Sequence, residues 1–522
     1  MKINFKNHGL NNIKLNFRII ILSVLVSLIF SFFTSIEFLL NFSNDDSFFY
    51  IKTAYNFSSG YGSTFDTINA TNGYHPLWFL MLSAYYFLLN LFVSFSPELF
   101  FRFTVLLICL ICIATEIIIY KYFKIINPSN YLKQFYLSVP LFFTLVVIRD
   151  FGMETHVLCL LITAYLYFKS DELMTQKSRL KTKLFLLVFI FLTRIDFLMN
   201  VIPIIILADY LTSPAEAGKK YLIYSLITVF CTAFAYFTSN YIFFGNFSTI
   251  TAKIKNSFPE IIFYKNFTDL FAPGTFTNQF VKSFYVAVTV IIFLLINLKK
   301  SFRDKFSKSD YFLFGLCISS LVFIISNLFF NHYTLKEWYV AFPAFICSLL
   351  MIRMINLFPR VYVFSLILFI SVFIYYFIRT RIENYKWDSM YYYALDLKNN
   401  TNENDRIFMI DLSGIVGYFS ERKIINGDGL VNNFEYWKYK TEGKIGDYLK
   451  ENKVKYYSTY STGKGNHEMR DSSGYLIDMC YSNKFGGYAY TFPREDLVLK
   501  SPYYYSHAVN SDKGFWYLFK LR

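Results

Sequence analysis

Long apolar runs alternate with short polar loops along the first three quarters of the chain, and short strand-like segments then replace them. An α-helix needs about 17–25 mainly apolar residues to cross a bilayer. The sequence predicts spans at Phe17–Phe42, Leu99–Tyr120, Phe135–Ile148, Met153–Phe168, Leu184–Leu211, Tyr221–Phe244, Val281–Leu298, Tyr311–Phe330, Trp338–Met351 and Val361–Ile378. A further apolar run, Pro76–Phe95, follows a polar segment.

From residue 383 onward the long apolar runs stop. Segments such as Arg406–Ile410 and Gly514–Leu521 read as strands, separated by turns rich in Gly, Asn and Ser. We therefore expect two domains, a membrane module at 1–382 and an α/β domain at 383–522.

The composition agrees with a membrane protein. Hydrophobic residues make up 55% and aromatic residues 21% of the 522 residues, and the mean hydropathy is +0.36. These values are too apolar for a soluble protein of this size. Six of the seven cysteines lie inside apolar runs, so neither a disulfide framework nor a zinc site can be read from their spacing.

Basic residues gather in loops between the predicted spans, which accounts for the net charge of +15 without a nucleic-acid partner. Cytoplasmic loops carry such an excess of Lys and Arg. The loops concerned are Lys121–Lys133, Lys169–Lys183, Lys299–Lys308 and Arg353–Arg360. The first span follows a basic start that lacks a small-residue cleavage site, which predicts an uncleaved anchor with a cytoplasmic N-terminus.

If these loops share one side, an even number of crossings must separate them. Three apolar runs precede Lys121, which is an odd number, so one of them cannot cross. We expect this run to be Pro76–Phe95, lying along the outer surface. Arg194-Ile195-Asp196 interrupts Leu184–Leu211, which we expect to form two half-length helices. This gives about 11 membrane helices and one juxtamembrane helix, with the C-terminal domain outside the cytoplasm. A topology in which Pro76–Phe95 spans and Lys121–Lys133 lies outside is the alternative.

Two adjacent carboxylates, Asp45 and Asp46, directly follow the first predicted span. A charge at the hydrocarbon boundary costs free energy unless it is solvated or paired, and neighbouring acids repel each other. The pair could begin a helix at Ser47–Ser58 by satisfying free backbone N–H groups, hold an ion, or act in catalysis. Capping and catalysis are compatible, and we favour a site that combines them.

Glu154 is a second acid at a predicted outer boundary, and Gly152 before it allows a sharp turn into the following helix. Glu154 could simply favour that helix N-terminus. With Asp45 and Asp46 nearby, however, it could take a proton from a hydroxyl or hold a divalent cation such as Mg²⁺ or Mn²⁺. These three acids are the candidate catalytic residues and the candidate metal ligands.

Positive charge is predicted on the same face, at Arg149, Arg194, Lys253, Lys255 and Lys336. An enzyme needs such charge to hold a phosphate that becomes more negative as it leaves. Of these we choose Arg149, Arg194, Lys253 and Lys336, although any one could be a boundary residue whose side chain reaches the lipid headgroups.

Aromatic residues open the predicted interfacial helix. Tyr74, His75 and Trp78 could stack on sugar faces or anchor the helix at the headgroup level, and the anchor is the better reading for Trp78. With Asp196 they form the candidate substrate-binding set.

Four motifs occur together in this chain: Asp45-Asp46 after the first span, TNGYHPLW at Thr71–Trp78, GMET at Gly152–Thr155 and Arg-x-Asp at Arg194–Asp196. This combination resembles the GT-C superfamily of membrane glycosyltransferases. More specifically, it resembles bacterial relatives of the dolichyl-phosphate-mannose-protein mannosyltransferases and the mycobacterial arabinofuranosyltransferases. The resemblance continues into GYFSERKIINGDGLVNN at Gly417–Asn433.

The resemblance implies an inverting transfer of a sugar from a polyprenyl-phosphate donor to an acceptor hydroxyl on a glycan, glycolipid or protein. It implies that Asp45 or Asp46 is the base, that Glu154 is a second acid, and that Arg194 and Lys253 hold the donor phosphate. Some members use a divalent cation and others do not. The expected location is the inner membrane, with the site on the extracytoplasmic face.

Two other functions are open at this point. A transporter or flippase for a lipid-linked sugar or anionic solute would also carry charged residues in its membrane region, although here they gather at one boundary. A binder that keeps the fold without catalysis is the other alternative, and it would tolerate replacement of the acidic pair.

Overall fold

The computed structural model describes residues 6–92, 96–147, 151–263, 267, 279–333, 335–358, 387–461, 475–480, 488–505 and 514–522. The predicted span Val361–Ile378 and the candidate Arg149 lie outside these residues.

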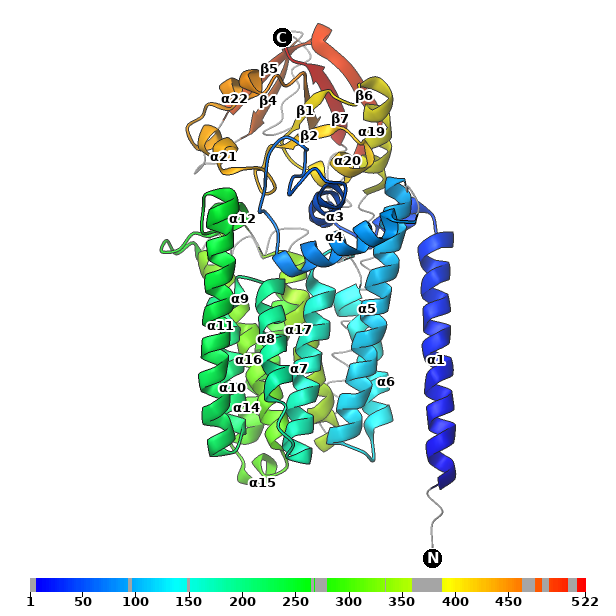
Figure 1. Ribbon diagram of the computed structural model, residues 1–522, viewed down its shortest axis with the longest axis vertical. Coiled ribbons are helices and arrows are strands. Elements are labelled where there is room, and N and C mark those ends of the chain that lie inside the picture. Colours follow the sequence, from blue (N-terminus) through cyan, green and yellow to red (C-terminus); the bar gives the residue numbers. More distant parts are fainter. Residues whose placement is uncertain are drawn as a thin grey trace, which may run out of the picture.

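Long helices run side by side in a bundle, with the C-terminal domain at one end (Figure 1). They are α1 (Lys6–Phe33), α5 (Pro97–Ile126), α6 (Tyr131–Phe142), α7 (Thr155–Thr175), α8 (Leu180–Thr193), α10 (Ile202–Thr212), α11 (Ala215–Phe244), α14 (Val281–Asn297), α16 (Lys308–Phe330) and α17 (Glu337–Leu357). A π-helical turn, Phe143–Val147, extends α6. Among the described helices, α5, α11, α16 and α17 are long and apolar enough to span a membrane.

The predicted division of Leu184–Leu211 is confirmed. Helix α8 ends at Thr193, Arg194 is extended, and a short helix, α9 (Phe197–Asn200), leads into α10. At this break the two charged side chains bind each other, since the Arg194 guanidinium donates to both carboxylate oxygens of Asp196.

The basic loops lie together at the end of the bundle remote from the C-terminal domain. The side chain of Ser170, late in α7, hydrogen-bonds to that of Ser309, at the start of α16, with 2.5 Å between the two Oγ atoms. Arg353 Nε donates to Asp310 Oδ1 at 2.7 Å. A short helix in the basic loop, α15 (Lys300–Arg303), and the N-terminus both lie at this end (Figure 1). This is the grouping that the charge pattern predicts, and its side of the membrane stays a prediction.

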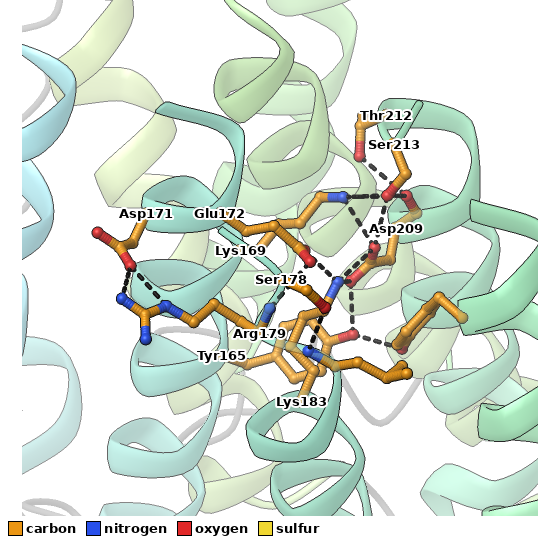
Figure 2. Close-up of polar contacts among 12 residues, drawn as sticks. Tyr165, Lys169, Asp171, Glu172, Ser178, Arg179, Lys183, Asp209, Thr212 and Ser213 are labelled. Atoms are coloured by element: carbon orange, nitrogen blue, oxygen red, sulfur yellow. Dashed lines mark hydrogen bonds and ion pairs between the residues drawn. The ribbon is translucent and has the colours of Figure 1, made fainter. Parts of the chain in front are cut away.

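A buried ion network closes this basic end (Figure 2). Asp209 of α10 accepts from Lys169 of α7 at 2.8 Å and pairs with Lys183 of α8 at 3.0 Å. Tyr165 donates to the same carboxylate at 2.7 Å, and Lys183 also pairs with Glu172. Because breaking a buried ion pair leaves an uncompensated charge, the network fixes α7, α8 and α10 against each other.

At the opposite end, three short helices lie between the bundle and the C-terminal domain. They are α2 (Ile36–Leu40), α3 (Asp45–Ser58) and α4 (Pro76–Asn90), and a fourth, α12 (Ile250–Lys255), follows α11. Helix α4 crosses the ends of the long helices instead of running along them (Figure 1). This is the arrangement expected for the run Pro76–Phe95, whose position relative to a bilayer stays a prediction.

The C-terminal domain contains the predicted mixture of helices and strands. A five-stranded sheet has the order β2-β1-β3-β7-β6, with β1 parallel to β2 and β3 and the other pairs antiparallel. Strands β4 and β5 form a separate hairpin. The strands are β1 (Arg406–Met409), β2 (Lys423–Asn426), β3 (Tyr456–Ser461), β4 (Tyr475–Cys480), β5 (Tyr488–Pro493), β6 (Leu497–Tyr505) and β7 (Gly514–Lys520), with helices α19 (Trp387–Asn400), α20 (Ser413–Phe419), α21 (Phe434–Thr441) and α22 (Ile445–Glu451).

Candidate active site

The acidic pair lies in the first turn of α3, where the bundle meets the C-terminal domain. Asn44 caps this helix, because its side chain accepts from the backbone N–H of Ser47 at 2.9 Å. The expected helix is therefore present, and Asp45 and Asp46 occupy the positive end of its dipole. Consecutive residues of a helix point about 100° apart, so the two carboxylates meet different neighbours.

Asp45 binds the C-terminal domain. Its two carboxylate oxygens accept from the backbone N–H groups of Gly414 at 3.0 Å and Ile415 at 2.8 Å, at the start of α20. The residue is only 4% exposed. Burial raises the pKa of Asp45 to about 8, while the two N–H donors act in the opposite direction. With both oxygens engaged, Asp45 caps α20 and joins the two domains.

The same two helices are joined again two turns further on. Lys52 of α3 is buried, and its Nζ donates to the backbone carbonyls of Gly417 and, at 2.9 Å, Arg422. An acid at the start of a helix and a base near its end both favour the helix dipole. Helix α20 is thus held at both ends by α3.

Asp46 lies among charged side chains of both domains. Burial raises its pKa, Lys255 and Lys336 lower it, and Asp411 and Glu154 raise it again. Asp46 is only half-buried, in contrast to Asp45. A carboxylate with a raised pKa beside lysines is suited to accept a proton from a substrate hydroxyl.

Lys255, and not Lys253, faces this carboxylate. Thr249 caps α12, and residues two apart on a helix point to roughly opposite sides. Lys253 is exposed. Burial lowers the pKa of Lys255, but Tyr339, Asp46 and Asp428 outweigh it and the pKa is raised overall. Of the two lysines on this helix, Lys255 is therefore the one in electrostatic contact with Asp46, and a phosphate site here stays a prediction.

Arg194 is held by two acids. Its guanidinium donates to Glu154 Oε1 at 2.8 Å and to both carboxylate oxygens of Asp196 at 3.0 and 2.7 Å. It also lies over the rings of Tyr339 and Phe323, and it is 2% exposed. Because most of its N–H donors are already used, we infer that Arg194 positions Glu154 and Asp196, and that it contributes little free charge.

The position of Glu154 depends on the close approach of Gly152 to α3. Gly152 has a φ of +92°, and a Cβ there would lie 2.6 Å from Cβ of Ser47 on α3. Only glycine adopts this conformation without strain. The turn brings the start of α7 against α3, and the charge of Glu154 acts on Asp46.

Of the aromatic candidates, His75 lies nearest to the acids. Its Nε2 is 3.9 Å from Glu154 Oε1, and its Nδ1 accepts from the backbone N–H of Ile195 at 3.5 Å. Burial lowers the pKa of His75. Trp78 is fully buried and donates to Gly152 O at 2.6 Å, and Tyr74 stacks on Phe79. Trp78 therefore has no face free for a sugar.

The C-terminal domain contributes two acids that the sequence analysis did not select. Asp411 follows β1 and Asp428 follows β2, and these strands are parallel neighbours. The carboxyl ends of parallel strands meet at one edge of a sheet, where α/β proteins commonly bind ligands. Each acid follows a short apolar, strand-like run in the sequence, and this is the signal that could have identified them.

The expected metal ligands do not come together. Within the described part of the chain, no group of three or more His, Cys, Asp or Glu side chains is placed to hold a metal ion. Asp45 is turned toward α20, Glu154 binds Arg194, and Lys255 and Lys336 lie beside Asp46. Cations already occupy the surroundings of these acids, so the donor set does not fit a divalent ion.

No protein-family model matches the sequence, and no curated protein matches it. Among solved structures, the chain is similar to the Archaeoglobus fulgidus oligosaccharyltransferase in complex with Zn and sulfate, with 11% identity, 84% of this chain and 67% of that chain covered, and a TM-score of 0.53. The apo form of the same enzyme gives 9% identity, coverage of 85% and 69%, and a TM-score of 0.54. The chain thus shares the fold of this oligosaccharyltransferase.

Proposed function

We propose that the protein is a membrane glycosyltransferase that moves a sugar from a polyprenyl-phosphate donor to an acceptor hydroxyl. The observation that carries this proposal is the position of Asp46 in the first turn of α3, half-buried and in electrostatic contact with Lys255 and Lys336. A base next to cations suits a reaction in which a proton is removed and a phosphate departs. The fold shared with an oligosaccharyltransferase supports the same class of reaction.

In the proposed reaction, Asp46 takes the proton from the acceptor hydroxyl. The acceptor oxygen forms a bond to the anomeric carbon as the bond from that carbon to the phosphate oxygen breaks. The electron pair of the broken bond stays on polyprenyl phosphate, and the configuration inverts. General-base assistance contributes roughly 10²–10⁴-fold to such rates.

Lys255 and Lys336 are the proposed phosphate ligands. Fixed positive charges stabilise the developing negative charge of the leaving group without reorganisation during the reaction. Of the four basic residues selected from the sequence, Lys336 keeps this role, Lys255 replaces the exposed Lys253, and Arg194 acts through the acids that it holds.

We assign the base to Asp46 because Asp45 is already engaged. A carboxylate that accepts two backbone N–H bonds at the start of a helix has little capacity left for a substrate proton. The acceptor, whether glycan, glycolipid or protein, would lie on the side of Asp46 away from the lysines.

A transporter is less compatible with the described contacts. Transport requires a route that opens in turn to each end of the bundle. Lys169, Asp209 and Lys183 form a buried, mutually paired cluster at the basic end (Figure 2). Opening this end would leave these charges unpaired.

The deciding experiment is mass spectrometry of glycans and lipid-linked intermediates in cells with and without the gene, complemented by the wild type, Asp46→Asn or Asp447→Asn. Asp447 is an exposed acid on α22 and serves as the control. The proposal expects one sugar to disappear while its lipid donor persists, and only the wild type and the control to restore it. Full restoration by Asp46→Asn would exclude the proposed mechanism.

A further inference from the structure

The loop that follows β2, Gly427–Leu430, is fixed from within the C-terminal domain. Asn426 Oδ1 accepts from the backbone N–H of Gly429 at 2.9 Å. Lys440 Nζ donates to the carbonyl oxygens of Gly427 and Asp428, each at 2.9 Å. These bonds use backbone atoms of the loop, so its shape does not depend on the Asp428 carboxylate alone.

The membrane module holds the same loop from the other side. Thr251 of α12 donates to Leu430 O at 2.9 Å. Gly73, in the TNGYHPLW motif, comes so close that a Cβ there would lie 1.9 Å from Leu430 O. The loop is therefore wedged between α12, which carries Lys255, and the segment that leads to His75.

The same contacts bring Asp428 close to Lys255. Thr251 and Lys255 are four residues apart on α12 and lie on one face of this helix. A Cβ on Gly429 would lie 3.2 Å from Cδ1 of Ile254, the residue before Lys255. Asp428 Oδ1 accepts from the backbone N–H of Leu430 at 2.7 Å, which uses one of its two oxygens, and Lys255 is in electrostatic contact with both Asp428 and Asp46.

The charges around Lys255 indicate what kind of ligand Asp428 would bind. Asp46 and Asp428 already share the positive charge of Lys255. A donor phosphate adds more negative charge. Hydroxyl groups can satisfy a carboxylate without adding charge, since each donates one hydrogen bond to an oxygen.

We propose that Asp428 binds hydroxyl groups of the sugar being transferred, next to the phosphate that Lys255 holds. The inference rests on the proposed function. The sugar ring is bonded directly to the phosphate, so a residue that shares Lys255 with the phosphate lies within reach of hydroxyls close to the anomeric carbon. The ligand class is a neutral sugar with free hydroxyls at these positions, and its recognition comes from the C-terminal domain.

The test compares two kinds of lipid on the full-length protein in lipid nanodiscs. One probe is undecaprenyl phosphate, and the others are undecaprenyl phosphates bearing glucose, galactose, mannose or arabinofuranose. Affinities are measured for the wild type, Asp428→Asn, Lys255→Met and the control Asp447→Asn. Asparagine keeps the shape of Asp428 and its bond to the Leu430 N–H, and binding of undecaprenyl phosphate reports that the variant is folded.

The expected result is that Asp428→Asn binds undecaprenyl phosphate as the wild type does, but binds the preferred sugar lipid about tenfold more weakly, as for the loss of a hydrogen bond to a charged group. Equal loss for both probes, loss for neither, or a wild type that prefers no sugar lipid would overturn the inference. If undecaprenyl phosphate does not bind the wild type, or Lys255→Met binds it normally, the proposed function itself fails.

Discussion

Asp45 and Gly414 are in such close contact that a methyl group on Gly414 would clash with Asp45. A Cβ at Gly414 would lie 2.1 Å from the backbone oxygen of Asp45 and 3.0 Å from its Cγ. The two domains therefore meet backbone to backbone at the place where the acidic pair begins α3.

Gly414→Ala is expected to destabilise the protein, because the domains must move apart to admit the methyl group. Overpacking of this kind costs about 1–3 kcal/mol. Thermal unfolding in detergent should show a lower midpoint. Transfer activity should fall as well, because Asp428 of the C-terminal domain moves away from Asp46. An unchanged midpoint would mean that the contact is looser than described.

The two aspartates should respond differently to the same substitution. Asp45→Asn replaces one of the two oxygens that accept from the backbone N–H groups of α20 with an amide nitrogen, which cannot accept, and is expected to cost about 1–3 kcal/mol of stability. Asp46→Asn is expected to leave the unfolding midpoint near that of the wild type and to lower the rate of sugar transfer roughly 10²–10⁴-fold. Thermal unfolding and single-turnover transfer measured on both variants provide the comparison. The opposite pattern would assign the base to Asp45.

Lys253→Met and Lys255→Met form a matched pair on one short helix. Loss of the half-buried Lys255, which is in electrostatic contact with Asp46, should raise the KM for the lipid donor about tenfold or more, since hydrogen bonds between charged groups are the strong ones. Loss of the exposed Lys253 should leave the KM within about twofold, as expected for a surface substitution. A larger effect at Lys253 would support the assignment of Lys253 as the phosphate ligand, which the sequence analysis favoured.

The pH profile of the transfer rate should move in opposite directions in two variants. The rate falls at low pH as Asp46 becomes protonated. Asp411→Asn removes a negative charge that raises the pKa of Asp46, so the acid limb should shift to lower pH. Lys336→Met removes a positive charge that lowers this pKa, so the limb should shift to higher pH. Rates at saturating donor from pH 4 to 9 test this, and shifts in the same direction would show that another group titrates.

Asp209→Ala should be among the most damaging changes far from the site. It would leave Lys169 and Lys183 buried near each other without their shared partner (Figure 2), and breaking a buried pair costs about 3–5 kcal/mol. Yield and unfolding midpoint of the purified protein are the measurements. A stable Asp209→Ala protein with normal activity would mean that the network does not hold the basic end together.

Local patterns predicted the features that depend on neighbouring residues. Apolar runs predicted the helices, the charges at Arg194 and Asp196 predicted the break between α8 and α10, and Asp45 with Asp46 predicted a helix start here, although the residue that caps α3 is Asn44. These follow from burial, helix periodicity and capping, which act over a few residues.

Contacts between distant segments could not be predicted in this way. Nothing near Asp45 in the sequence indicates that Gly414 and Ile415 would engage it, which is why the two acids of the pair could not be told apart. The choice between Lys253 and Lys255 depended on where a six-residue helix begins, at the cap Thr249. Asp411 and Asp428 come to the same edge of the sheet because β1 pairs with β2.

The double attachment of α20 to α3 bears on how the proposed substrates would enter. Swinging the C-terminal domain away from the bundle like a lid would break the bonds of Asp45 and Lys52 together. Buried donors and acceptors left without partners cost free energy. On the proposed function, we therefore expect a lipid donor that travels in the membrane plane to deliver its headgroup while the two domains stay joined.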